Sequence, residues 1–225
     1  MEYNTQTHNT MEHNQNNDTD TQTSYAELAM KIIKDKHLEK VERNIWDNSD
    51  YKLIKDLESD DVGKVGEHII AMYCNKSQIP SVIDGIKTKQ LGGGSGDGTI
   101  YRKTVEIKTA RQGSKNNSFQ HELGEVPWKA EYMIFLDISP DKMYITIFKN
   151  FTEEFYKNSG IDKSYKCAPY FPTKTITWRK QVGAFKLDTT VKINDKNVKN
   201  NYTFVIDETE NDYSKFKSYV ESIIK

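Results

Sequence analysis

GDGTIYRKTVEIKTA, residues 96–110, is the stretch of this sequence that constrains the fold most strongly. Apolar and polar residues alternate over 99–110, and this alternation predicts a β-strand. Val105 and Ile107 fall on the same face of that strand. One face is therefore expected to pack into the core, and the opposite face is free to carry chemistry.

The polar face of this strand carries Glu106 and Lys108, and Asp97 lies in the glycine-rich turn before it. If the turn brings Asp97 back beside Glu106, two carboxylates and one ammonium group meet at a single point. Two carboxylates and a substrate phosphate oxygen form a suitable open site for Mg²⁺, which keeps several water ligands. The metal polarises the phosphoryl group and acidifies a bound water. A lysine at this position orients the attacking water or neutralises charge that develops in the transition state.

Asp97 followed by Glu106-x-Lys108 resembles the catalytic core of the PD-(D/E)xK nuclease superfamily. That superfamily includes most type II restriction endonucleases, Holliday-junction resolvases and several repair nucleases. Gly96 stands where the family has a proline. The resemblance covers 62–148 and implies that Asp97 and Glu106 ligate Mg²⁺ while Lys108 assists the attacking water.

The family often has a further glutamate on an earlier helix, and Glu67 resembles it. A helical stripe of apolar residues is expected around this position, and Glu67 lies off the stripe, which comprises Val62, Val65, Ile69 and Tyr73. Glu67 is therefore a candidate third metal ligand. The alternative is that it is an ordinary exposed helix residue.

The charge distribution favours a nucleic-acid partner although the net charge is −1. Residues 87–115 contain seven bases and two acids, and 163–200 contain nine bases and two acids. Because the two acids of the first segment are the expected metal ligands, its bases are available for phosphates. The alternative is that these lysine-rich segments are solvated surface. The residues expected to contact DNA are Arg102, Arg111, Lys115, Gln120, His121, Lys174, Arg179 and Lys180.

The expected fold is α/β, with a mixed central β-sheet flanked by helices, and additional strands and a helix at the C-terminus. Residues 1–23 are polar and are expected to be a disordered tail, and 24–225 to form a single nuclease domain. The core of that domain is expected at 62–148, and 149–225 is expected to serve DNA recognition or dimerisation.

Periodicity predicts the individual elements. Helices are expected at 24–46 with Ser24 as N-cap, at 50–76 with a break near 60–63, and at 213–224. Strands are expected at 99–110, 132–138, 143–148, 173–178, 184–191 and 202–206.

The sequence has no apolar run long enough to span a bilayer and no apolar stretch typical of a signal peptide at its start. A soluble, cytoplasmic protein is therefore expected. Cys74 and Cys167 are the only cysteines, which predicts neither a disulfide framework nor a cysteine-rich zinc site. Cys74 is expected to be a small buried hydrophobe.

Taken with the resemblance, these features predict a Mg²⁺-dependent endonuclease that cuts double-stranded DNA at specific sequences and leaves 5′-phosphates. A type II restriction enzyme of this kind is expected to be a homodimer, because two-fold protein symmetry matches a palindromic site. A cognate methyltransferase is expected in the same system. Two alternatives remain: a resolvase or repair nuclease acting on branched or damaged DNA, and a DNA-binding protein without activity.

Overall fold

The structure is a computed structural model that describes residues 24–40, 44–84, 96–114, 117–124, 130–149, 164–167, 171–179, 184–207 and 212–225. For 38–40, 124, 164–167 and 171–179 it describes the backbone alone. The chain divides into two compact units, residues 1–43 and 44–225. Within the described ranges, no helix is both long and apolar enough to cross a membrane.

Helix α1, Tyr25–Lys40, belongs to the first unit, and it begins where the sequence predicts. Ser24 Oγ accepts a hydrogen bond from the backbone N–H of Glu27, whose side chain accepts one from the Ser24 N–H. This reciprocal pair is a capping box. The predicted end at residue 46 is wrong, because Trp46 lies in a turn and is buried in the core of the second unit. There the Asn44 side chain accepts from the Trp46 N–H, a local bond that competes with helix.

The second predicted helix is two elements, a 3₁₀-helix η1, Lys52–Asp56, and α2, Ser59–Lys76. The break therefore lies before the predicted one, at Leu57, whose backbone is extended with ψ 145°. The buried stripe of α2 also differs from the expected one. It consists of Val62, Gly66, Ile70, Tyr73 and Cys74.

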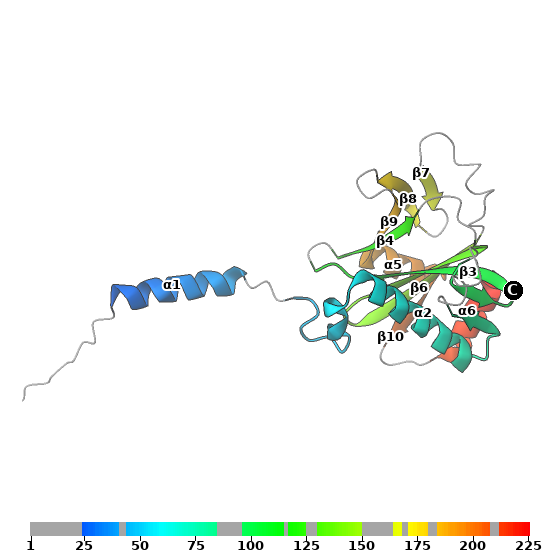
Figure 1. Ribbon diagram of the computed structural model, residues 1–225, viewed down its shortest axis with the longest axis horizontal. Coiled ribbons are helices and arrows are strands. Elements are labelled where there is room, and N and C mark those ends of the chain that lie inside the picture. The colour runs from blue at the N-terminus through cyan, green and yellow to red at the C-terminus, as the bar shows by residue number, and fades with distance from the viewer. Residues whose placement is uncertain are drawn as a thin grey trace, which may run out of the picture. The chain divides into compact units, whose positions relative to one another are not determined.

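The central sheet has six strands in the order β1-β2-β3-β5-β6-β10. Figure 1 labels β3, β6 and β10 of this sheet. β3 and β5 are parallel, and every other neighbouring pair is antiparallel. This confirms the predicted α/β class with a mixed sheet. The bounds are β1 Ser81–Ile83, β2 Gly98–Ile100, β3 Lys103–Arg111, β5 Tyr132–Ile138, β6 Lys142–Lys149 and β10 Thr203–Asp207.

The predicted strand at 99–110 is in fact a hairpin of β2 and β3. The chain reverses at Tyr101 and Arg102, whose φ angles are +48° and +64°. Two successive residues with positive φ are typical of a tight hairpin turn, although neither is a glycine. The apolar alternation runs through both strands, so periodicity alone did not reveal the reversal.

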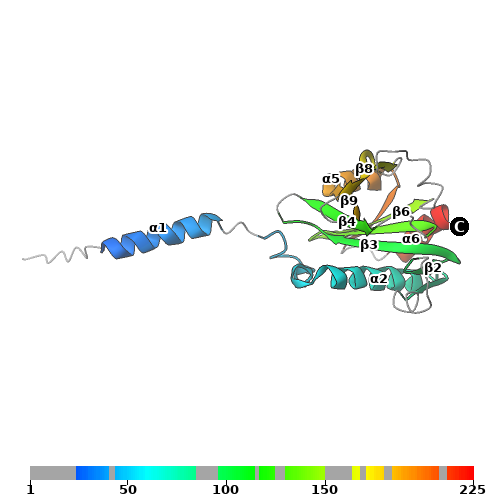
Figure 2. The same ribbon diagram turned by 45° about the horizontal axis from the view of Figure 1, so that its top comes forward.

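The two faces of the central sheet are covered differently (Figure 2). Val105 and Ile107 of β3 share one buried cluster with α2 and with α6, Tyr213–Ile224. Ala110 of β3 packs on the opposite face with residues of β4, Ser118–Gly124, and of α5, Val191–Lys199. The α2 and α6 side is therefore distinct from the β4 and α5 side.

A second, antiparallel sheet has the order β4-β9-β8-β7. Its other strands are β7 Ser164–Cys167, β8 Phe171–Arg179 and β9 Ala184–Thr190. The segment after residue 149 thus supplies three strands of this sheet, and also β10 of the central sheet and α6 on its far face. The expected elaboration at 149–225 therefore includes two elements, β10 and α6, that belong to the central sheet and its hydrophobic core.

Cys74 is fully buried, as predicted for a small hydrophobe. Burial raises the pKa of its thiol to about 11, an effect that a hydrogen bond with Ser81 partly offsets. A thiol in this environment is inert at neutral pH.

Candidate functional site

The β2–β3 hairpin carries Asp97 back to the strand that bears Glu106. Gly98 pairs with Val105, and the Asp97 N–H donates to the Val105 carbonyl at 2.8 Å. The Asp97 carboxylate then accepts the N–H of Ile107 through Oδ2, also at 2.8 Å. This bond holds the first acid against the backbone between Glu106 and Lys108, which is the juxtaposition that the sequence predicted.

Two glycines allow this close approach. Gly96 has φ +109°, and a Cβ there would collide with the carbonyl oxygen of Val105. At Gly98 a Cβ would collide with the Val82 carbonyl of β1. Only glycine adopts the first conformation without strain, and only glycine lets the backbones approach so closely. Gly96 therefore has a structural role of its own at this turn.

Glu106 and Lys108 point from the same face of β3, because side chains two residues apart share a face. Lys108 Nζ lies 2.6 Å from Glu106 Oε1. The two side chains are 27% and 28% exposed, so water and a ligand can reach both. The face is the one that carries β4 and α5, since Ala110 shares its alternation.

Glu67 lies on α2, which covers the opposite face. Its neighbour Gly66 packs directly on Thr109 of β3, where a Cβ would collide with Thr109 Oγ1. Glu67 is half-buried, on the helix that packs against β3. To join the other acids its side chain must reach around the edge of β3.

Asp84 is a further acid beside the site, and the sequence argument missed it. It follows β1, and its backbone N–H donates to the Asp97 carbonyl at 3.3 Å. The short apolar pair before it, Val82 and Ile83, was the only local signal. In the part of the chain that the structure describes, no three Asp, Glu, His or Cys side chains are gathered into a metal-binding group.

Gln120 and His121, the two expected DNA contacts on β4, have opposite environments. Gln120 is exposed, whereas His121 is buried and places Nε2 2.6 Å from Asp137 Oδ1. Asp137 Oδ2 in turn accepts from Asn194 of α5 at 2.7 Å. His121 also packs edge-on against Phe135, the residue paired with Lys108. It is thus a structural neighbour of the site and is shielded from solvent.

The remaining expected DNA contacts have different positions. Arg102 is exposed at the hairpin turn. Arg111 Nη1 donates to the carbonyls of Ile54 and Leu57, so this guanidinium anchors the segment before α2. For four others, side-chain positions lie outside the described residues: Lys115, Lys174, Arg179 and Lys180.

An ion pair ties the start of β3 to the segment before β5. Lys103 Nζ lies 3.0 Å from Glu131 Oε1. The hydrogen bond between them raises the pKa of Lys103 and lowers the pKa of Glu131. The Thr104 N–H also donates to Glu131. These contacts fix the N-terminal end of the strand that carries Glu106 and Lys108.

Replacing Gly96 with alanine is expected to destabilise the hairpin by about 1–3 kcal/mol, because an alanine there is strained at positive φ and collides with β3. The collision also pushes Asp97 away from Ile107. Urea denaturation measures the loss of stability. Gly63 of α2 is the matched control, since a Cβ at that position would meet no atom within 4 Å. Gly63→Ala should leave stability unchanged or raise it by up to about 1 kcal/mol. Equal effects of the two substitutions would contradict this account.

Comparison with known proteins adds no relative: no family model, no curated protein and no solved structure matches this chain.

Proposed function

We propose that this chain is a Mg²⁺-dependent DNA endonuclease that hydrolyses phosphodiester bonds and leaves 5′-phosphates. The observation that carries the proposal is the Asp97 carboxylate on the Ile107 N–H, beside the Glu106–Lys108 pair. Asp97, Glu106 and Lys108 are all partly exposed, and the Asp97 carboxylate lies against the backbone that joins the other two residues. A surface ion pair alone would not require the two glycines that press Asp97 onto β3.

The donor set suits Mg²⁺. Asp97 and Glu106 offer hard carboxylate oxygens, and Mg²⁺ is commonly bound by one or two carboxylates together with waters and substrate phosphates. Glu67 is the proposed third acid. When bound, Mg²⁺ would polarise the phosphoryl group and lower the pKa of a bound water. The residues present therefore fit the metal that the proposal requires.

Lys108 has the role of orienting the nucleophile. Its ammonium group is held by Glu106 at 2.6 Å, and it has further N–H groups that can donate to a water or a phosphate oxygen. Its positive charge offsets negative charge that builds on the phosphoryl oxygens in the transition state. Because it is paired in advance, little reorganisation is needed when the substrate binds.

Within this class we favour a sequence-specific type II restriction enzyme acting as a homodimer with a cognate methyltransferase. The second sheet supports this choice, since it lies on the same face of the central sheet as Glu106 and Lys108. An additional sheet beside the catalytic residues is a surface on which bases can be read. A two-fold dimer would present two such sites to a palindrome.

The test is digestion of a long DNA of mixed sequence with Mg²⁺ and with EDTA. Discrete Mg²⁺-dependent fragments whose ends carry 5′-phosphates are the expected result, and mapping those ends identifies the site. Preferential cutting of a four-way junction would replace the restriction assignment by a resolvase. Binding without any cleavage of linear or branched DNA would contradict an enzymatic function.

A further inference from the structure

An open groove runs along α5 at some distance from the acids on β3. It is lined by Asn117, Thr190, Val191, Lys192, Asp195, Lys196 and Lys199. Three of these residues are lysines at positions i, i+4 and i+7 of the helix, which places them along one face. The opposite face of the helix buries Asn194 and Asn197. The exposed side of α5 is therefore a continuous basic stripe above a polar, buried side.

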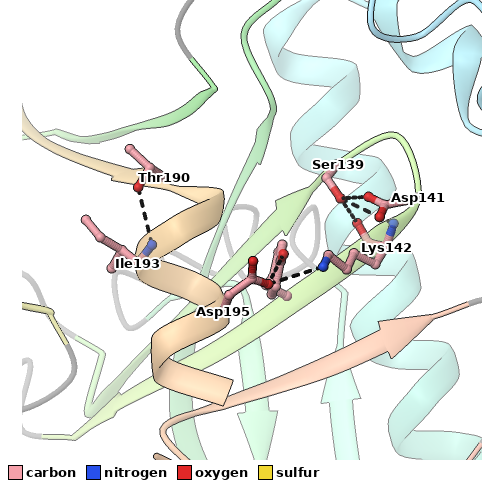
Figure 3. Close-up of polar contacts among 7 residues, drawn as sticks. Ser139, Asp141, Lys142, Thr190, Ile193 and Asp195 are labelled. Carbon is pink, nitrogen blue, oxygen red and sulfur yellow. Dashed lines mark hydrogen bonds and ion pairs between the residues drawn. The ribbon is translucent and has the colours of Figure 1, made fainter. Parts of the chain in front are cut away.

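The positive charge of this stripe is not neutralised within the described chain. Lys192, Lys196 and Lys199 are exposed and form no ion pair with any described residue. Asp195, the acid in the groove, forms an ion pair with Lys142 of β6, whose Nζ lies 3.2 Å from Asp195 Oδ1 (Figure 3). Tyr144 Oη donates to the same oxygen at 2.7 Å. The three lysines are thus available for an external anion.

The loop before β4 and the turn into α5 shape the wall of the groove. The Asn117 carbonyl accepts the N–H of Val191 at 3.4 Å, and Asn117 has φ +50°. Thr190 caps the helix, its Oγ1 accepting from the Ile193 N–H at 3.3 Å (Figure 3). The position of the lysine stripe relative to the sheet is consequently well defined.

The groove lies on the sheet face that carries the candidate site. Val191 packs against the buried cluster of Ala110, Phe119 and Tyr144, and Ala110 shares the β3 face of Glu106 and Lys108. Ala110 lies four residues beyond Glu106, or about 13 Å at the usual rise of a strand. A long polyanion that occupies the site can therefore extend onto α5.

We propose that the α5 groove binds the sugar-phosphate backbone of duplex DNA away from the bond that is cut. This inference rests on the proposed function for the choice of DNA as the polyanion. The lysine stripe from Lys192 to Lys199 is about 10 Å long at the rise of an α-helix. One DNA strand advances about 3.4 Å per phosphate along the duplex axis, so the stripe is about as long as three successive phosphate steps. Contacts of this kind position a duplex without reading its sequence.

The test is the salt dependence of DNA binding, measured by fluorescence anisotropy with a labelled duplex in EDTA so that no cleavage occurs. The variant replaces Lys192, Lys196 and Lys199 with glutamine. Each lost phosphate contact is expected to make the negative slope of log K against log salt shallower by about 0.9. Loss of all three contacts would therefore change the slope by up to about 2.7. Affinity at low salt should fall as well.

The matched control replaces Lys52, Lys64 and Lys76, which are exposed lysines of η1 and α2, with glutamine. It removes the same net charge from the opposite side of the central sheet. Its slope should stay close to that of the wild type. An equal change of slope in both triple variants would show that the effect comes from net charge alone, and this would overturn the inference. An unchanged slope in the α5 variant would also overturn it.

The outcome is separable from the test of the nuclease function. If the wild type cleaves DNA and the α5 variant keeps the wild-type slope, the groove inference fails and the endonuclease stands. If no DNA is cleaved but the α5 variant alone loses slope, the groove stands and the endonuclease fails. Tighter binding of double-stranded RNA than of DNA through the same lysines would overturn the choice of DNA.

Discussion

Lys108→Ala and Asp97→Asn are each expected to lower the rate of Mg²⁺-dependent DNA cleavage by about 10²–10³-fold, the usual cost of removing one electrostatic contribution to a transition state. Asparagine keeps an oxygen that can accept the Ile107 N–H, so Asp97→Asn removes the charge and leaves the hairpin in place. Lys108→Ala removes the ammonium group that Glu106 holds at 2.6 Å. Single-turnover cleavage with saturating enzyme measures the chemical step for both variants.

The matched controls are a lysine and an aspartate that each form an exposed ion pair away from the candidate site. Lys103 is also on β3 and also paired with an acid, but it is 47% exposed and points to Glu131. Lys103→Ala should leave the rate within about twofold, since surface ion pairs contribute little. Asp61→Asn on α2 is the matched control for Asp97→Asn, and it should likewise leave the cleavage rate within about twofold. Wild-type cleavage rates in the Lys108 and Asp97 variants would exclude this site as the catalytic centre.

Asp137→Ala is expected to destabilise the fold by about 3–5 kcal/mol, the usual cost of removing one partner from a buried ionisable pair. The His121 and Asp137 side chains are 0% and 2% exposed. Alanine would leave His121 Nε2 and the Asn194 amide without their hydrogen-bond partner in the interior. Urea denaturation measures the change as a lower midpoint with an unchanged slope.

Two comparisons sharpen this prediction. Asp137→Asn keeps one oxygen acceptor and should cost less than the alanine variant. Asp141 lies four residues after Asp137 and is exposed, and its carboxylate accepts a hydrogen bond from Ser139 Oγ. Asp141→Ala should therefore lower the free energy of unfolding by no more than about 1 kcal/mol. A loss below about 1 kcal/mol for Asp137→Ala would show that the network linking β4, β5 and α5 contributes little to stability.

Strand β5 and helix α6 illustrate what local pattern determines. The segment 132–138 is predicted to be a strand, and β5 has those bounds and lies between β3 and β6. The predicted helix at 213–224 matches α6, whose buried Phe216, Val220 and Ile224 follow helical spacing. In both cases the apolar residues of the element pack into the interior, so neighbours along the chain contain the necessary information.

Helix α5 shows where the same reasoning failed. Its fully buried residues are Asn194 and Asn197, and only Val191 and Val198 pack partly against the core, so its apolar stripe is too short for a periodicity argument to detect. Asp137 is also missed by reasoning from the sequence, and it lies inside a predicted strand whose other residues are apolar. A lone acid at such a position was itself a signal, because a buried carboxylate requires partners. The lysines of α5 likewise have a helical spacing that was visible only once the segment was known to be a helix.

By itself, the sequence determined the α/β class, the main strands after residue 130 and the identity of the candidate catalytic residues Asp97, Glu106 and Lys108. These depend on residue type and short-range spacing, which are properties of neighbours in the chain. Only the tertiary structure decided that β2 folds back on β3, that the Asp84 backbone contacts the Asp97 backbone, and that α5 packs on the sheet face of Glu106 and Lys108. The physical reason is that each of these depends on contacts between segments whose register is set by the packing of the whole core.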